Sequence, residues 1–178
     1  MTMTEAVPGA QPVLDWSWLP FHDLSAVQIY DLLALRQRVF VVEQACVFQD
    51  ADGIDPQCWH GLGYLPDGRL GAYARIVPPG LTYQQPSIGR VVTAPTLRGV
   101  NVGHQLMDQA MAQAGRLFPG RAIKIGAQAH LQGFYGRFGF EPVGEIYDED
   151  GIEHIHMVTK DTLTVVAETG TRRNSEEG

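Results

Sequence analysis

The feature that most constrains the fold is a short segment, Arg98-Gly99-Val100-Asn101-Val102-Gly103. It follows an apolar run, Ile88 to Val92, and it precedes a helical pattern, Gln105 to Leu117. A glycine-containing loop between a strand and a helix presents converging backbone N–H groups, and the helix N-terminus adds about half a positive charge. Arg98 adds a cation at the mouth of the loop. The segment therefore predicts a strand–loop–helix unit that holds a pyrophosphate.

Two common phosphate-binding motifs are missing from the chain. It has no G-x-x-x-x-G-K-[ST], and no G-x-G-x-x-G followed by an acidic residue about twenty positions later. The segment instead resembles the acyl-CoA loop of the GNAT superfamily of N-acetyltransferases, [RQ]-x-x-G-x-[GA], with Arg98 in the first place and Gly103 in the last. Asn101 replaces the middle glycine, and the loop can still close because asparagine tolerates a positive φ. For the loop alone, an ordinary connection between a strand and a helix is the alternative.

A second motif lies about thirty residues downstream, at Phe134-Tyr135-Gly-Arg-Phe-Gly139-Phe140. We predict a short helix that ends at Gly139 in a left-handed C-cap and is followed by a strand. The motif resembles the F-Y-x-x-x-G-F signature after the fifth strand of the GNAT superfamily. That resemblance makes Tyr135 the acid that lies beside the sulfur of CoA and reprotonates the leaving thiolate. The alternative is a half-buried aromatic residue whose hydroxyl is satisfied elsewhere.

Four further segments resemble the ElaA-like branch of this superfamily, and the similarity spans about Asp15 to Val158. The resemblance implies an α/β fold with a mixed, mostly antiparallel sheet, helices on both faces, and fourth and fifth strands that splay apart to admit the acyl-pantetheine. We expect this single domain over residues 12–160, between a flexible N-terminus, 1–11, and a disordered tail, 161–178. The four segments are Leu35 to Gln44, Gln49 to Gly53, Gly126 to His130 and Asp150 to His154.

The hydrophobic patterns agree with alternating strands and helices. Asp23 or Ser25 can cap a helix that runs to about Phe40, with its apolar side inward. Period-two alternation and turn residues predict strands over residues 13–18, 59–65, 70–76, 87–92, 122–126, 140–147 and 154–158.

The resemblance implies transfer of an acetyl group from acetyl-CoA to a primary amine, by direct attack in a ternary complex. A catalytically silent domain that binds acyl-CoA, as a sensor or interaction module, is the alternative. The backbone of the fourth strand would pair with the pantetheine and polarise the carbonyl oxygen near Val92. The expected CoA-binding residues are Val91, Val92, Thr93, Arg98, Gly99, Val100, Asn101, Val102, Gly103, His104 and Gln128.

The general base is open, because the fourth strand lacks the glutamate that many members of the superfamily carry there. Glu43 lies in the segment that usually shapes the acceptor pocket, and its alternative role is a cap or an ion pair with Arg36 or Arg38. His130 follows the fifth strand, and an imidazole is suited to proton transfer at neutral pH. His154 is a further candidate, with an ordinary strand residue as the alternative.

An acidic stretch follows Glu43, with Asp50, Asp52 and Asp55. These carboxylates are candidates for holding a cationic amine acceptor, and the alternatives are a solvated acidic loop or a metal site. The spacing lacks the calcium-loop pattern D-x-[DN]-x-[DN]-G, so we expect no metal.

Composition limits the partners. The net charge of -7 argues against a nucleic-acid partner, because phosphate binding needs a basic face. No run approaches the roughly 18 apolar residues of a membrane span, and the N-terminal residues lack a signal-peptide pattern. Two cysteines, Cys46 and Cys58, are expected to be reduced thiols in a cytoplasmic protein, with an acyl-carrying Cys46 as a remote alternative. We expect a small-molecule or peptide amine as acceptor and, as a habit of the superfamily, a homodimer.

Overall fold

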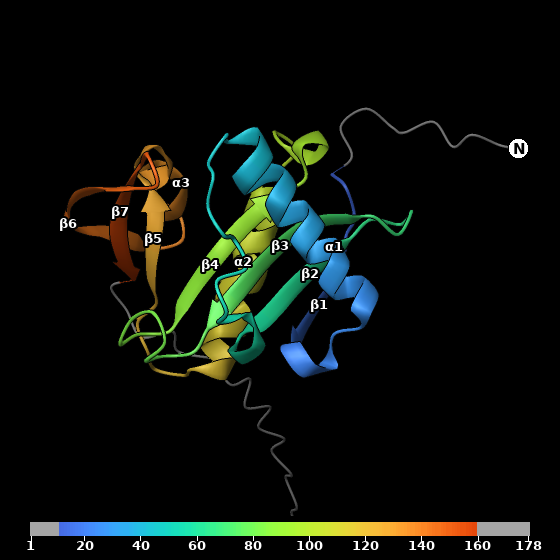
Figure 1. The fold of residues 1–178 in the computed structure, drawn as a ribbon. Coiled ribbons are helices and arrows are strands. Elements are labelled where there is room, and N and C mark those ends of the chain that lie inside the picture. Colours follow the sequence, from blue (N-terminus) through green and yellow to red (C-terminus); the bar gives the residue numbers. More distant parts are fainter. Residues whose placement is uncertain (1–10, 160–178) are drawn as a thin grey trace, which may run out of the picture.

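A seven-stranded sheet runs through the part of the chain that this computed structural model describes, residues 11–159 (Figure 1). The strand order is β1-β2-β3-β4-β5-β7-β6, and every neighbouring pair is antiparallel except β4 and β5, which are parallel. The predicted mixed, mostly antiparallel sheet is therefore confirmed. The strands are β1 (Asp15–Pro20), β2 (Trp59–Tyr64), β3 (Leu70–Val77), β4 (Ser87–Thr93), β5 (Lys124–Gln128), β6 (Phe140–Glu149) and β7 (Ile152–Thr159).

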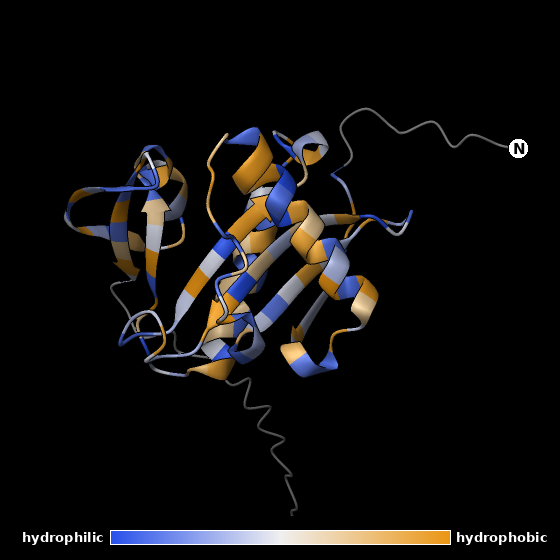
Figure 2. Cartoon of the chain, in the orientation of Figure 1, coloured by the Kyte–Doolittle hydropathy of each residue, from blue (hydrophilic) through white to orange (hydrophobic). Residues whose placement is uncertain are grey.

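Helices cover both faces of the sheet, as predicted (Figure 1). The helix α1 (Ala26–Arg36) packs on one face, α2 (Val102–Leu117) packs on the other, and the short α3 (Gln132–Gly136) precedes β6. Side chains alternate between the faces of a strand, so β3 contributes Ala74 to the core under α2 and Tyr73 to the core under α1. Figure 2 shows that polar and apolar residues are interspersed along the strands and along α1.

The helix α1 begins at a capping box and changes its winding near its end. Ser25 is the cap: its hydroxyl accepts from the Gln28 N–H at 3.2 Å, and the Gln28 side chain accepts from the Ser25 N–H at 2.8 Å. The α-helical winding ends at Arg36, earlier than predicted. From there the chain stays helical but takes the wider π-helical winding over Gln37–Glu43. That wider winding carries the chain to the edge of the functional site.

The sheet opens between β4 and β5, which confirms the predicted splay. Only Ser87 and Lys124 are paired between these two strands, and the strands then diverge (Figure 1). The backbone of β4 beyond Ser87 therefore has a free edge toward β5.

The predicted N-terminal segment lies outside the described residues apart from Gln11, and the predicted tail, 161–178, lies wholly outside them. The division of the chain into one domain and two ends therefore stays a prediction. Within residues 11–159, no helix has the length and the apolar character needed to cross a membrane.

Candidate active site

A cavity of about 850 Å³ occupies the gap between β4 and β5. Its walls come from β4, the loop before α2, β5, α3, the turn between β6 and β7, and the π-helical segment. Every residue predicted to bind CoA lines this cavity except Val100, which is 42% exposed. The cavity also brings together Tyr135 and the three candidate bases, Glu43, His130 and His154.

The loop before α2 has the geometry of an anion cradle. Gly99 and Asn101 both adopt left-handed conformations, with φ of +76° and +68°, which confirms that asparagine can replace the family's middle glycine. The first helical hydrogen bond runs from Gln105 N–H to the Asn101 carbonyl at 3.2 Å. The amides of residues 102–104 precede that bond, at a helix end that favours negative charge. The loop can thus hold a pyrophosphate.

Gly103 keeps the loop open on the cavity side. A Cβ added there would lie 3.7 Å from the Phe134 ring, which is an ordinary van der Waals contact. Internal crowding therefore does not require glycine at this position. The absence of a Cβ leaves the backbone of residue 103 uncovered on the side of the cavity that it lines.

Glu43 is held by the arginine of the loop. Its two carboxylate oxygens accept from Arg98 Nη1 and Nη2 at 2.6 and 3.1 Å, and the two side chains are 40% and 46% exposed. The ion pair considered for Glu43 is therefore present, but its partner is Arg98 and not Arg36 or Arg38. It ties the π-helical segment to the loop across the mouth of the cavity.

Tyr135 is buried, at 8% exposure, yet it borders the cavity. Its ring packs edge-on against Phe134 and Phe140, with centroids 5.0 and 6.2 Å away. Burial raises the pKa of Tyr135 to about 12. Within residues 11–159 the Tyr135 hydroxyl forms no hydrogen bond, and burial alone accounts for its raised pKa, so the phenolic proton is free to serve a ligand.

The turn after α3 fixes the position of Tyr135. The helix ends at Gly136, three residues earlier than predicted, and the Gly139 N–H bonds to the Gly136 carbonyl at 3.1 Å. Gly139 has a φ of +83°, so its predicted left-handed conformation is confirmed. The chain can then reverse into β6.

The strand β4 carries a bulge where it borders the cavity. Its register with β3 changes from Arg75–Gly89 to Tyr73–Val92. Two β4 residues therefore stand opposite one β3 residue, and Arg90 has a φ of +52°. Such a bulge re-aims the neighbouring backbone groups.

The two histidines differ in their surroundings. His154 is 15% exposed at its side chain, and its Nδ1 donates to the Ile152 carbonyl at 2.8 Å. That hydrogen bond places the proton of the neutral ring on Nδ1 and leaves a lone pair on Nε2. His130 is exposed and lies in the turn between β5 and α3.

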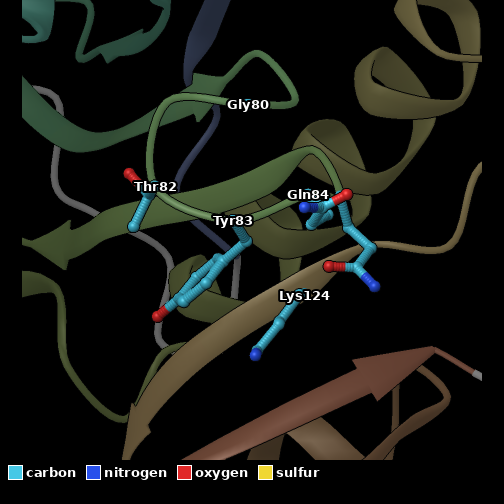
Figure 3. A pocket seen from close by; sticks show the side chains of 6 residues that line it. Gly80, Thr82, Tyr83, Gln84 and Lys124 are labelled. Carbon is cyan, nitrogen blue, oxygen red and sulfur yellow. The ribbon is translucent and has the colours of Figure 1, made fainter.

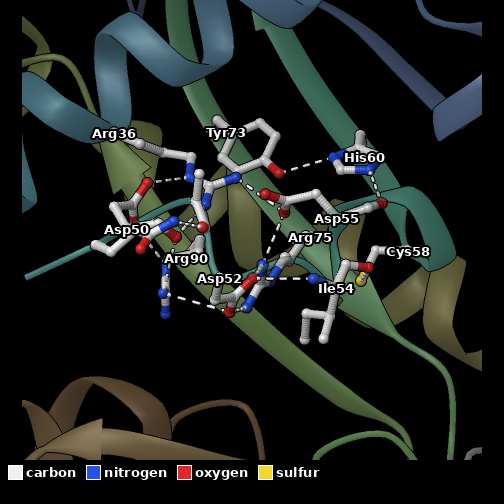
Figure 4. A network of polar contacts seen from close by, with 12 residues as sticks. Arg36, Asp50, Asp52, Ile54, Asp55, Cys58, His60, Tyr73, Arg75 and Arg90 are labelled. Carbon is white, nitrogen blue, oxygen red and sulfur yellow. Dashed lines mark hydrogen bonds and ion pairs between the residues drawn. The ribbon is translucent and has the colours of Figure 1, made fainter.

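None of the three carboxylates of the acidic stretch lines the larger cavity. Asp50 and Asp55 are buried, which corrects the expectation of a solvated loop for these two residues, while residues 51–53 are exposed. The three carboxylates form a network with three arginines, Arg36 from α1, Arg75 from β3 and Arg90 from β4 (Figure 4). Arg36 is fully buried, and Asp50 and Asp55 are 8% and 7% exposed.

The arginines favour the ionised form of Asp52 and of Asp55. Burial opposes the charge on Asp52, but hydrogen bonding and the charge of Arg75 outweigh it and lower the pKa of Asp52 to about 2. Burial likewise opposes the charge on Asp55, and Arg36 and Arg75 lower its pKa. Carboxylates engaged in this way are not available to an amine or a metal. Over residues 11–159, no group of three or more His, Cys, Asp or Glu side chains is placed to hold a metal ion.

A smaller cavity, of about 380 Å³, lies between the β3–β4 loop and the start of β5 (Figure 3). Lys124 lies there with its Nζ 4.5 Å from the centre of the Tyr83 ring. None of the residues predicted to bind or react borders it. The larger cavity is therefore the candidate active site.

Several residues of the larger cavity were not predicted. Gln44 accepts from Gln128 Nε2 at 3.3 Å, across the cavity from β5. The turn between β6 and β7 also reaches the cavity. Gln44 and this turn both lie in segments that resemble the ElaA-like branch, so the sequence marked them as part of the family pattern. The resemblance assigns them no role, however, and they were not predicted as site residues. The unpredicted lining residues include Phe40, Gln44, Phe48, Glu149, Asp150 and Ile152.

Comparison with known proteins agrees with this geometry. Residues 70–160 match the family model described as an acetyltransferase (GNAT) domain. Escherichia coli ElaA is 46% identical over 147 residues, which cover 82% of this chain and 95% of that protein. A Synechocystis protein is also 46% identical, over 145 residues that cover 82% of this chain and 94% of that protein.

Two crystal structures are also similar. That of Escherichia coli ElaA has a TM-score of 0.78 and 45% identity, and covers 83% of this chain and 99% of that one. That of an acyl-CoA N-acyltransferase from Pseudomonas aeruginosa has a TM-score of 0.78 and 44% identity, and covers 82% of this chain and 99% of that one.

Proposed function

Because the chain belongs to the GNAT acetyltransferase family, in its ElaA-like branch, we propose that it transfers an acetyl group from acetyl-CoA to a primary amine. The acceptor is a small molecule or a peptide amine, and both substrates are bound together when the amine attacks. The observation that carries this proposal is that the larger cavity has an anion cradle at one end and the unpartnered Tyr135 hydroxyl in its wall.

The donor site is built mainly from backbone groups. The free edge of β4 at Val91 to Thr93 can pair with the pantetheine amides as an added strand would. The amides of residues 102–104 can hold the pyrophosphate at the N-terminus of α2. Arg98 has five N–H donors, so it can contact a phosphate while it keeps Glu43.

In the proposed reaction, the neutral amine nitrogen attacks the thioester carbonyl carbon, the C–N bond forms and the C–S bond breaks. Backbone N–H groups near Val92 stabilise the negative charge that develops on the carbonyl oxygen. The Tyr135 hydroxyl donates its proton to the departing thiolate. Its raised pKa keeps the phenol protonated throughout the neutral range.

The amine must lose a proton to a base, and three residues of the cavity are proposed for this role. His154 offers a lone pair on Nε2, His130 is open to solvent, and Glu43 must first release a hydrogen bond from Arg98. Replacing each in turn, as Glu43→Gln, His130→Asn and His154→Asn, separates them. The variant that loses the base should show a steep fall in kcat with unchanged CoA affinity. Wild-type activity of all three from about pH 6 to 9 would point to a water chain.

The test of the function is release of free thiol from acetyl-CoA with a panel of amines that includes diamines, amino-acid amides and peptide N-termini. We expect at least one amine to raise thiol release well above hydrolysis. The alternative is a silent acyl-CoA sensor, which the absence of a carboxylate from β4 favours. Thermal stabilisation by CoA without any amine-dependent thiol release would support that alternative.

The proposal also includes the cellular compartment and the oligomeric state of the protein. Cys46 and Cys58 are both free and buried, which suits a reducing, cytoplasmic compartment. The homodimer stays a prediction.

A further inference from the structure

Arg90 holds a backbone conformation that residues with a Cβ avoid. Its φ of +52° lies in the left-handed region, which is open to glycine and costly for other residues. At a bulge of this kind the left-handed position commonly carries glycine. An arginine there carries a backbone cost that a side-chain contact can offset.

That contact is an ion pair with the acidic stretch. Arg90 Nε donates to Asp50 Oδ1 at 2.7 Å, and Arg90 Nη2 donates to the Asp50 carbonyl at 3.2 Å. The same Nη2 lies 3.5 Å from Asp52 Oδ2. Figure 4 shows the Arg90 side chain turned toward the two carboxylates. The side chains of Arg90 and Asp50 are 24% and 8% exposed, so solvent screens their contact only weakly.

Asp50 is itself fixed from the opposite side. The fully buried Arg36 donates from Nε to Asp50 Oδ2 at 2.7 Å and from Nη2 to the Asp50 carbonyl at 2.9 Å. Each oxygen of the Asp50 carboxylate is therefore held by a different arginine, one on α1 and one on β4. Asp50 cannot follow a movement of Arg90 without breaking its bonds to α1.

The fixed bulge is also a wall of the active-site cavity. Residues 89–93 line that cavity, and β4 is unpaired with β5 beyond Ser87. A change of φ at Arg90 would turn the peptide groups that follow it, and with them the N–H groups near Val92. In catalysis, oriented donors lose their effect when they are displaced by about 1 Å.

We propose that Arg90 and Asp50 are positioning residues, whose ion pair holds the β4 bulge so that its backbone N–H groups meet the carbonyl oxygen of the thioester. The inference rests on the proposed acetyl transfer. Neither side chain takes part in the chemistry. Through Asp50, the Arg90 side chain is connected to Arg36 on α1, and this connection restrains the β4 backbone at the reacting end of the cavity.

The test uses Arg90→Gly, because glycine adopts the left-handed conformation without the side chain. Asp50→Asn is a second variant, but it leaves the buried Arg36 and the half-buried Arg90 short of a counter-charge and can fail to fold. The matched control is Ala45→Gly: Ala45 is exposed, has a φ of +50° and does not line the cavity. It relieves the same kind of backbone strain without removing an ion pair.

We expect Arg90→Gly to fold and to bind acetyl-CoA with a KM within about threefold of wild type, while kcat falls by at least about tenfold. Amide hydrogen exchange of the peptide spanning 87–93 should accelerate about tenfold, and that of β2 should not change. Ala45→Gly should match wild type in kcat and in exchange of the 87–93 peptide.

Two results would overturn the proposal. Wild-type kcat in a folded Arg90→Gly protein would show that the ion pair does not position the reacting groups. A raised KM with unchanged kcat would make Arg90 a substrate contact instead. If the wild-type protein transfers no acetyl group to any amine, the proposed function fails. Faster exchange in the variant would then keep the ion pair as a structural brace and remove its catalytic role.

Discussion

Tyr135→Phe is the substitution that tests the proposed chemistry most directly. It removes one oxygen atom and keeps the ring, which packs between Phe134 and Phe140. No described group hydrogen-bonds to the hydroxyl, so its removal leaves no partner without a bond. A typical hydrogen bond contributes about 1 kcal/mol to stability, and none is lost here, so the free energy of unfolding should change by less than about 1 kcal/mol.

The effect on turnover should be much larger than the effect on folding. General-acid help is typically worth roughly 100- to 10,000-fold. An alkyl thiol has a pKa near 8.5, so the departing thiolate is a fair leaving group and water can protonate it later. We therefore expect a fall in kcat at or below the lower limit of this range, about 10- to 100-fold, which corresponds to about 1.4 to 2.7 kcal/mol of transition-state stabilisation.

The pKa of Tyr135 adds a second, independent signature. Burial raises this pKa from 10 to about 12, so the phenol stays protonated while the unfolded chain loses its proton. The contribution of protonated Tyr135 to the free energy of unfolding is therefore fully present below pH 10 and is lost as the pH rises toward 12. Tyr135→Phe should lack this alkaline loss. In the wild-type protein, any fall in kcat between pH 7 and pH 10 must come from another group.

The assay is steady-state thiol release with the best amine of the panel, combined with calorimetric titration of CoA. The fall should appear in kcat, while the dissociation constant of CoA moves by less than about threefold. A folded Tyr135→Phe protein that turns over like wild type would show that the hydroxyl is structural. A variant that no longer binds CoA would show that Tyr135 is a binding contact and not an acid.

Two further predictions concern the anion cradle and the buried network. Gly103→Val should fold, since its Cβ meets only an ordinary contact, and should weaken CoA binding in calorimetry by at least about tenfold, or 1.4 kcal/mol; Asn101→Gly, at a left-handed position, should bind CoA as wild type does. Unchanged affinity of Gly103→Val would refute the cradle. Asp55→Asn removes one partner of a buried network and should lower the free energy of unfolding by about 3 kcal/mol, or roughly 6 to 12 °C in Tm, whereas Asp67→Asn, in an exposed pair, should leave Tm indistinguishable from that of the wild-type protein. The pKa of Asp55 is lowered in the folded state, so its contribution is fully present above about pH 4 and is lost progressively as the pH falls toward the lowered pKa; a difference between Asp55→Asn and wild type that does not shrink as the pH falls below about 4 would contradict this account.

The parts of the site that depend on local chemistry were predictable from the sequence. The left-handed positions Asn101 and Gly139 follow from which residues tolerate a positive φ, and the structure confirms both. The splay of the fourth and fifth strands was different, because hydrophobic periodicity identifies strands but not their neighbours. That feature came from resemblance to a family, and the order of the strands in the sheet was not predicted.

The end of α1 shows a limit of periodicity. The apolar spacing of Leu32, Leu35 and Val39 fits an α-helix and continues past the point where the α-helix ends. A π-helical turn widens the winding by a fraction of a residue, which a stretch of seven residues is too short to reveal. The position of Glu43, and its pairing with Arg98, follows from that turn and could not be predicted.

The buried network shows a different limit of sequence-based prediction, because its carboxylates and arginines are far apart in the sequence and meet only in the folded protein. Residues 50–55 contain carboxylates without a basic neighbour, while the arginines that neutralise them lie up to 40 residues away along the chain. A signal was nevertheless present on the arginine side. Arg75 interrupts an apolar strand, and Arg36 lies among the buried positions of α1. A charge that the hydrophobic pattern buries must find an opposite charge elsewhere in the chain. The acidic stretch supplies it, and in doing so it is removed from the acceptor site and becomes the support of β4.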